Sequence, residues 1–389
     1  MSEDLRAVAS ECVHCGFCLP ACPTYQLWGE EMDSPRGRIH LLTQLLDGAP
    51  LTEAGASHFD RCLGCMACMT ACPSGVQYDQ LLEAAREMTA TGSVRERAIF
   101  SVFPYPRRLR ALSTPLRALQ RTGLDQRLPL PGFLGSALRL APRVPRQLRL
   151  PERIPARGPR RAVVGMLTGC VQSVFFPQVN AATARVLASE GCDVIIPRDQ
   201  GCCGALSLHS GRRDEASRMS SRLAEVFARA GVDSIVVNSA GCGSAMKSSM
   251  DGVQDLSEFL VSLGTVATRH PLPVTAAYHD ACHLLHAQRI SAEPRKLLAE
   301  IPSLSVVELA DAGTCCGSAG VYNLLQPSTA QELGDKKADS VRASGASLVI
   351  SANPGCSLQI AASLRGQGHS VRVAHTAQVL DASIRGVSL

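Results

Sequence analysis

One cysteine pattern occurs twice near the start of the chain and constrains what can form around it. The pattern Cys-x-x-Cys-x-x-Cys-x-x-x-Cys-Pro spans residues 12–23 and again residues 62–73. Three cysteines at steps of three lie on one short loop, and the fourth, directly before a proline, leaves in a new direction. A chain with eight thiols in this arrangement must fold around something that binds thiolates.

The spacing is typical of loops that hold [4Fe–4S] clusters in proteins with two cubanes, where the fourth cysteine of each run binds the other cluster. Zinc sites and disulfides are the alternatives, but zinc sites usually use two separated cysteine pairs and not a triplet followed by Cys-Pro. We therefore predict one cluster on Cys12, Cys15, Cys18 and Cys72, and a second cluster on Cys62, Cys65, Cys68 and Cys22.

Cysteine content also indicates the compartment. The chain has 17 cysteines in 389 residues, which in a chain of this length favours metal binding in a reducing environment over a disulfide framework. Its first residues are polar and do not resemble a secretory signal, and no apolar run approaches the ~20 residues of a membrane span. We therefore expect a cytoplasmic protein.

The first domain is predicted to cover residues 1–92 and to be mainly helical. The 39 residues between Cys22 and Cys62 are too many for a compact βαββαβ ferredoxin. Within them, Ser34 and Pro35 are typical of a helix start. Arg36 and Arg38 follow, and they either solvate this helix end or point at an anionic cluster site.

Residues 93–160 form a basic linker rich in proline. Between Arg95 and Arg161 there are 16 arginines and 3 acidic residues, a balance of +13, so the rest of the chain carries 5 − 13 = −8. Short amphipathic helices are predicted at about 107–122 and 132–141. The linker either wraps the neighbouring domains or contacts a partner subunit or an anionic membrane. Nucleic acid is not expected, because no stacking aromatic residues accompany the arginines.

From residue 161 onward, strand and helix patterns alternate, which predicts α/β domains with parallel sheets. We predict a first cysteine-rich repeat over residues 161–272 and a second over 273–389. The expected strands are 162–167, 193–196, 234–238, 274–279, 305–309, 348–352 and 371–374. The expected helices are 177–190, 212–230, 255–263, 291–300, 328–344, 357–366 and 375–385.

Cysteines mark the duplication in this second half. Four of them recur at an offset of 112 to 114 residues: Cys170, Cys202, Cys203 and Cys242, and then Cys282, Cys315, Cys316 and Cys356. Four of the eight come just after predicted strands, and the Cys-Cys-Gly turns lie in loops before helices. Both places should gather at the carboxyl edge of a parallel sheet, where such folds bind ligands. We expect each set to hold a further iron–sulfur cluster or zinc, with buried structural cysteines as the alternative.

Other residues near these cysteines are assigned simpler roles. Cys192 has no counterpart in the second repeat and is interpreted as a core residue. His279, His283 and His286 surround Cys282, and we expect them to form hydrogen bonds or to be structural, not to bind a metal directly.

Taken together, the two Cys-Pro runs, the Ser-Pro-Arg-Gly-Arg segment at 34–38 and the duplicated Cys-Cys-Gly motifs resemble the iron–sulfur subunit of glycolate oxidase (glycolate dehydrogenase). The resemblance implies an electron-transfer component without catalytic residues of its own. FAD-containing partner subunits would oxidise glycolate to glyoxylate, and electrons would pass to a membrane-linked acceptor such as the quinone pool, with peripheral contact at the cytoplasmic face of the inner membrane. No Gly-x-Gly-x-x-Gly fingerprint opens a βαβ unit, which agrees with a flavin on another chain.

The resemblance leaves other electron donors open. In heterodisulfide reductase relatives the repeat ends in Cys-x-x-Cys and five thiolates hold a non-cubane cluster. Here Ser239 and Asn353 stand at the first position, so four cysteines per repeat remain, enough for a cubane. The alternatives are an equivalent subunit of a glycerol-3-phosphate, lactate or heterodisulfide oxidoreductase, a cluster-based redox sensor, and a zinc-stabilised scaffold.

Overall fold

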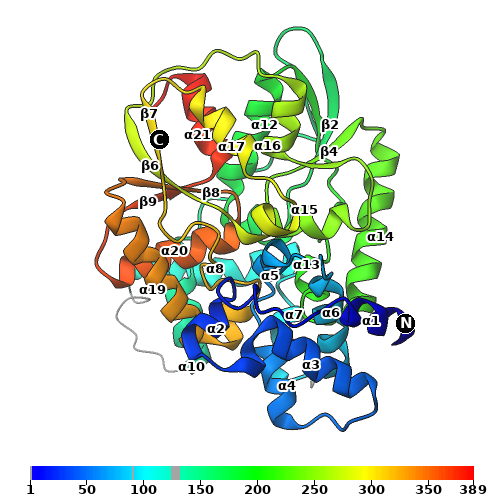
Figure 1. The fold of residues 1–389 in the computed structure, drawn as a ribbon. Helices are drawn as coiled ribbons and strands as arrows, with labels where there is room; N and C mark the ends of the chain where they lie inside the picture. The colour runs from blue at the N-terminus through cyan, green and yellow to red at the C-terminus, as the bar shows by residue number, and fades with distance from the viewer. Residues whose placement is uncertain (1, 90–91, 124–131) are drawn as a thin grey trace.

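The computed structural model describes residues 2–89, 92–123 and 132–389. A helical N-terminal part lies below two α/β units (Figure 1), which confirms the predicted fold class. Described residues of the N-terminal part contain no strand. Its elements are α1 (Ser2–Ser10), α2 (Pro23–Trp28), the 3₁₀ helix η1 (Glu31–Asp33), α3 (Pro35–Leu46), α4 (Glu53–Asp60), α5 (Ala67–Ala71) and α6 (Tyr78–Thr89).

Helix α3 begins as predicted. The Ser34 hydroxyl accepts a hydrogen bond from the Gly37 N–H at 3.0 Å, and Pro35 occupies the first helical position. This cap satisfies one of the backbone donors that a helix start leaves free. Leu42, Phe59 and Leu81 from α3, α4 and α6 then bury almost completely in one apolar core.

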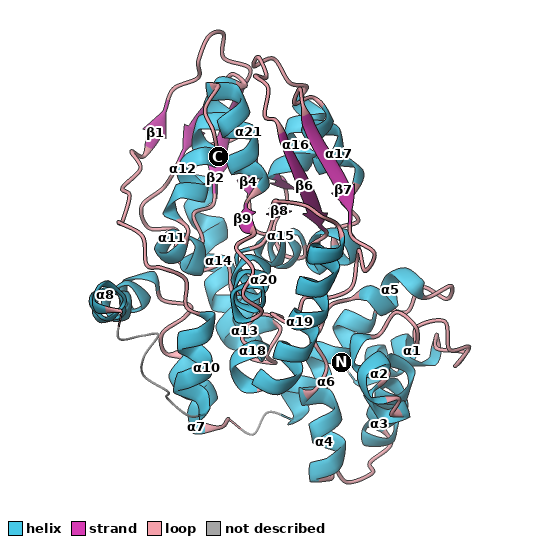
Figure 2. Ribbon diagram, turned by 90° about the vertical axis from the view of Figure 1, so that its left-hand side faces the viewer, coloured by secondary structure: helices cyan, strands magenta, loops and turns pink. Residues whose placement is uncertain are grey.

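The linker is more ordered than an extended chain. Its helices are α7 (Val94–Phe100), α8 (Pro106–Thr122) and α10 (Gly132–Leu140), which confirms the two helices predicted there; residues 124–131 of the predicted linker lie outside the described residues. Helix α8 contacts α11 (Cys170–Phe175) of the first repeat, and α10 contacts α18 (Tyr322–Leu325) and α20 (Pro354–Gly366) of the second. Figure 2 shows both linker helices on one flank of the molecule. The linker therefore packs against both repeats.

The first repeat contains a five-stranded sheet in the order β1-β3-β2-β4-β5. All neighbouring strands are parallel except β1, which pairs antiparallel with β3. Its strands are β1 (Arg153–Ile154), β2 (Ala162–Met166), β3 (Cys192–Ile195), β4 (Ser234–Val237) and β5 (Val253–Asp255). Its helices are α11 (Cys170–Phe175), α12 (Pro177–Ser189), α13 (Ala205–Leu208), α14 (Arg213–Ala230), α15 (Ala240–Lys247) and α16 (Leu256–Leu263).

The second repeat has a fully parallel sheet in the order β7-β6-β8-β9, which matches the order β3-β2-β4-β5 of the first. Its strands are β6 (Val274–His279), β7 (Leu304–Glu308), β8 (Leu348–Ser351) and β9 (Arg372–Ala374). Its helices are the π-helix η2 (His283–Ala287), α17 (Ala292–Ala299), α18 (Tyr322–Leu325), α19 (Pro327–Ala343), α20 (Pro354–Gly366) and α21 (Thr376–Arg385).

The strand predictions are confirmed to within about two residues, with two omissions. β1 and β5 have two and three residues, too few for a periodic pattern to show. The short helices α11, α13, α15 and α18 and the π-helix η2 were also not predicted, because they have only four to eight residues, too few for a helical period to show clearly.

The two repeats share one apolar core. Side chains from both sheets, including Val164 and Met166 from β2 and Tyr278 from β6, bury in the same cluster. Helix α12 packs against α21, and Arg185 makes a bidentate ion pair with Asp381 at 2.8 and 2.6 Å across this contact. Shared burial of this kind fixes the relative position of the two sheets.

A buried histidine at this contact gives stability a pH dependence. His375 Nδ1 accepts the Ala377 N–H at 3.0 Å and caps α21, so its Nε2–H donates to the Asn238 carbonyl at 2.8 Å. Burial lowers the pKa of His375 from 6.5 to about 4. Because the folded pKa lies below the unfolded one, this contribution is complete above pH 6.5 and is lost as the pH falls towards 4.

We predict that the free energy of unfolding falls more steeply between pH 7 and pH 5 in the unaltered protein than in His375→Gln. The loss of stability between the two pH values should be about 2 kcal/mol larger in the unaltered protein. The reason is that its unfolded state takes up a proton on His375 over roughly 1.5 pH units, from pH 6.5 to 5, while the folded state does not. Urea unfolding at the two pH values measures it. Equal pH slopes in the two proteins would contradict the role assigned to His375.

Candidate functional site

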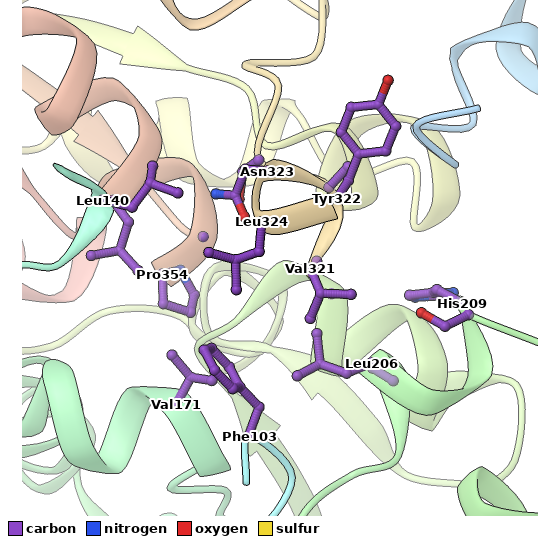
Figure 3. A pocket seen from close by; sticks show the side chains of 18 of the residues that line it. Phe103, Leu140, Val171, Leu206, His209, Val321, Tyr322, Asn323, Leu324 and Pro354 are labelled. Carbon is purple, nitrogen blue, oxygen red and sulfur yellow. The ribbon is translucent and has the colours of Figure 1, made fainter. Parts of the chain in front are cut away.

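All eight cysteines of the two repeats line one cavity of about 1040 Å³. The cavity lies where the carboxyl ends of β2 and β4 meet those of β6 and β8. Figure 3 shows its apolar walls, to which the linker contributes Phe103 and Leu140, the first repeat Val171 and Leu206, and the second repeat Leu324. The duplicated motifs thus belong to one site.

The thiols of the first repeat form a chain of contacts. Cys170 begins α11 directly after β2, and its sulfur lies 3.4 Å from that of Cys202. Cys203 contacts Cys202 and, on its other side, Cys242 of α15. Hydrogen bonds from the thiols of Cys170 and Cys203 lower the pKa of Cys202 well below its usual value. A thiol with a lowered pKa among other thiols suits the binding of a cation or a cluster.

The second repeat repeats this chain. Cys315 contacts Cys282 and Cys316, and Cys316 contacts Cys356 of α20. Hydrogen bonds from Cys315 and Cys356, together with the nearby imidazole of His279, lower the pKa of the Cys316 thiol well below its usual value. Cys282 precedes the π-helix η2, a rare geometry that occurs mostly at functional sites.

The repeats meet at the two positions where the heterodisulfide reductase pattern has a further cysteine. The Ser239 hydroxyl donates to Asn353 Oδ1 at 3.4 Å, and the Gly241 N–H donates to the same oxygen at 3.4 Å. Asn353 Nδ2 also donates to the Cys356 sulfur at 3.4 Å. The two residues therefore form a polar bridge between the repeats.

Glycine is required after each Cys-Cys pair. Gly204 and Gly317 both have φ of +86°, and a Cβ there would lie 2.8 Å from the Ala216 carbonyl oxygen and 2.5 Å from that of Ala330. Both the left-handed backbone and the close approach of the following helix exclude a side chain.

The eight N-terminal cysteines lie in two neighbouring groups. Cys22 and the cysteines of the second run lie within electrostatic reach of one another: burial first, and then the charges of Cys65, Cys62 and Cys22, raise the pKa of Cys68 well above its usual value. The remaining four cysteines, Cys12, Cys15, Cys18 and Cys72, line a small hollow, and Cys68 borders the same hollow. The structure thus brings together the four thiols of each predicted set.

The two arginines of the 34–38 segment have different surroundings. Arg36 is partly exposed and pairs with Glu31 at 2.6 Å. Arg38 is 1% exposed and pairs with the buried Asp33 at 3.2 Å. Burial opposes its charge, but Cys62, Tyr78 and Cys22 outweigh this effect, so the pKa of Arg38 is raised. A fixed positive charge therefore lies beside the second thiol set.

The second cysteine loop docks on the second repeat, a contact that sequence reasoning missed. Cys65 packs in one cluster with Cys315 and Tyr322, and Cys282 borders it. His283 and the Gly64 carbonyl lie 2.9 Å apart, and the Tyr322 hydroxyl donates to the Arg61 carbonyl at 3.1 Å. Burial raises the pKa of Cys65, and the charge of Cys282 raises it further. No sequence pattern links segments this far apart.

Comparison with known proteins agrees with this architecture. Residues 8–76 match the 4Fe-4S dicluster domain, and residues 164–247 and 276–361 match the cysteine-rich domain. Residues 92–154 match the linker region of the glycolate oxidase iron–sulfur subunit. The fold and the thiol sites thus define an iron–sulfur protein with a dicluster domain and two cysteine-rich domains.

Whole-chain relatives narrow this class. The chain is 34% identical to the probable glycolate oxidase iron–sulfur subunit of Bacillus subtilis (strain 168), over 95% of this chain and 92% of that protein. It is also 34% identical to the glycolate oxidase iron–sulfur subunit of Escherichia coli (strain K12), over 94% of each. The chain therefore belongs to the family of glycolate oxidase iron–sulfur subunits.

More distant similarities cover less or show the fold alone. Lactate utilization protein A of Exiguobacterium sp. is 31% identical over 57% of this chain and 98% of that protein. A crystal structure of a hypothetical protein from Helicobacter pylori has a TM-score of 0.55 at 8% identity, covering 90% of this chain and 68% of that chain. Among the described residues, no helix is long and apolar enough to cross a membrane.

The glycine geometry yields a stability prediction. Gly317→Ala should lower the free energy of unfolding by about 2–4 kcal/mol, because the new Cβ meets the Ala330 carbonyl in a left-handed backbone. Gly366→Ala is the matched control, since no atom lies within 4 Å of its Cβ position and the residue ends α20. Denaturant unfolding compares them. A loss in Gly317→Ala no larger than in the control would show that the turn is not constrained.

Proposed function

We propose that this chain is the electron-transfer subunit of a flavin-dependent glycolate oxidase. FAD-containing partner subunits oxidise glycolate to glyoxylate, and this chain carries the electrons onward to a membrane-linked acceptor. The observation that carries the proposal is the packing of Cys65 against Cys315 beside Cys282, because it connects the N-terminal thiols to the cavity between the repeats.

The N-terminal residues fit two [4Fe–4S] clusters. Cys12, Cys15, Cys18 and Cys72 would hold the first, and Cys62, Cys65, Cys68 and Cys22 the second, since each set offers four thiols and the second set is almost entirely buried. Such clusters supply one-electron transfer with little geometric change. The protein's own contribution is to exclude water from the second set and to place the Arg38 charge beside it.

We further propose that cysteines of both repeats bind metal and that electrons leave through the cavity, where the Cys170 set lies. Its walls include Leu109, Leu112 and Leu116 of α8 and Leu140 of α10, all from the linker. An apolar wall beside thiols suits an apolar acceptor such as a quinone better than a charged one. Peripheral contact with the inner membrane would bring such an acceptor to the linker side.

A lactate-oxidising complex is the second candidate, because lactate utilization protein A matches over nearly its whole length. The glycolate assignment is preferred since its relatives also cover the linker. Copurification with the partner flavoprotein, followed by dye reduction with each 2-hydroxy acid, distinguishes them: dependence on lactate alone would replace the glycolate assignment.

We predict that Cys65→Ser removes about half of the iron of the N-terminal clusters and reduces glycolate-dependent dye reduction to background, because one cubane loses a ligand in the most buried part of the path. Cys192→Ala is the matched control, since Cys192 is fully buried but lies in the core of the first repeat. Turnover that is undiminished in Cys65→Ser, with the iron lost, would disprove the relay.

Arg38 should tune the second cluster. Arg38→Met removes a buried positive charge and is expected to lower the reduction potential of that cluster by tens of millivolts, since a nearby cation stabilises the electron-rich state. Arg38→Lys keeps the charge and should shift the potential less. Arg36→Met, a change at a partly exposed site, is the control. EPR-monitored redox titration measures all three, and equal potentials in Arg38→Met and Arg36→Met would refute the role of burial.

A further inference from the structure

Three side chains of types that bind metals converge in the second repeat, at the cavity that Cys316 and Cys356 line. One ring nitrogen of His279 and the sulfurs of Cys316 and Cys356 all lie within 4.8 Å of one another. Their side chains are almost completely buried, with 1%, 1% and 3% exposed. Among the described residues, this is the one group of three or more histidine, cysteine or carboxylate donors that meets at this distance.

His279 ends β6 and is buried, so its imidazole needs a polar neighbour. That neighbour is the Cys316 thiol, whose pKa the imidazole helps to lower. Neither ring nitrogen has a hydrogen-bond partner among oxygen and nitrogen atoms. Leaving a buried ring nitrogen without a partner costs about 1–3 kcal/mol, a cost that a bound metal would remove. The other buried histidine at a repeat junction, His375, uses both nitrogens in hydrogen bonds.

The duplication makes the feature specific to one repeat. At the offset of 112 residues that relates Cys282 to Cys170, His279 corresponds to Leu167, which is 1% exposed and packs in an apolar cluster. The fold therefore accepts an aliphatic side chain at this position. Histidine in the second repeat is not a packing requirement, which leaves binding as the reason for its chemistry.

The donor spacing fits a single ion. Around a tetrahedral zinc ion, with Zn–S of about 2.3 Å and Zn–N of about 2.0 Å, donors lie roughly 3.5–3.8 Å apart. The first repeat also offers close sulfurs, with Cys170 and Cys202 3.4 Å apart, so the distinguishing feature of the second repeat is the imidazole nitrogen of His279. Mixed sulfur and nitrogen donors are also the usual zinc set. The fourth position faces the cavity, where the Cys282 and Cys315 thiols lie.

We propose that the second repeat holds a single zinc ion on His279, Cys316 and Cys356, and that the first repeat, with Leu167, has no equivalent site. The proposal deepens the metal-binding role assigned to the repeats, and it does not depend on the electron relay. Zinc is redox-inert, so the second repeat would not carry electrons itself. Its role would be structural: it would hold the Cys65 loop in place beside the cavity. The Cys170 set would remain for a redox-active group.

The test is the metal content of the full-length protein, purified anaerobically and washed with a chelator. We expect about one zinc per chain in addition to the iron of the N-terminal clusters. His279→Leu, which places the residue of the first repeat in the second, should lower zinc at least tenfold while leaving iron unchanged. Cys356→Ser should do the same. His286→Leu, a change within the π-helix η2 and outside the donor set, should retain zinc.

Cobalt gives an independent spectroscopic test. Protein loaded with Co²⁺ should show thiolate-to-cobalt absorption that is absent in His279→Leu, and a far-UV circular dichroism spectrum equal to that of the unaltered protein excludes misfolding. Full zinc occupancy in His279→Leu, or loss of iron in place of zinc, would overturn the proposal. Failure of the electron relay would appear separately, as lost dye reduction in protein that keeps its zinc.

Discussion

The structure depends on the meeting of two parallel sheets at their carboxyl edges. Each sheet delivers four cysteines to that edge, and the shared core of β2, β6, α12 and α21 holds the two edges against each other. The Ser239–Asn353 bridge and the Ala240 N–H to Ala352 carbonyl bond at 3.2 Å connect them directly. Because packed interiors do not deform continuously, the thiols of both repeats keep fixed positions around one cavity.

The N-terminal part and the linker both pack against the carboxyl edges of the two sheets, where the cavity lies. The second cysteine loop of the N-terminal part docks beside Cys282 and Cys315, and Arg86 of α6 donates to the carbonyls of Cys62 and His209, which ties the loop to the first repeat as well. On another side, the linker covers the cavity with leucines. The basic linker, expected either to wrap the neighbouring domains or to contact a partner or a membrane, therefore contributes walls to the site, and most of its described arginines are exposed.

The sequence predicted what is encoded locally. The cysteine spacing predicted two N-terminal thiol sets whose members the structure brings close together, the strand patterns identified seven of the nine strands in the described residues, and the offset of 112 to 114 residues identified the duplication. It did not identify the docking of Cys65 on the second repeat or the convergence of His279 with Cys316 and Cys356, because these depend on tertiary contacts over tens to hundreds of residues. His279 was expected to form hydrogen bonds or to be structural, and its imidazole does contact the Cys316 thiol. The mismatch between His279 and Leu167 in the duplicated alignment was the available signal.

The central claim is that two N-terminal clusters feed a metal-bearing cavity inside one packed body. The most direct measurement is iron and acid-labile sulfide counting on anaerobically purified protein, combined with EPR after reduction. We expect at least eight irons per chain, as two cubanes require, and a reduced spectrum with the broadening of two magnetically interacting clusters. Four irons or fewer, or zinc in the N-terminal sets with no EPR signal on reduction, would contradict the claim.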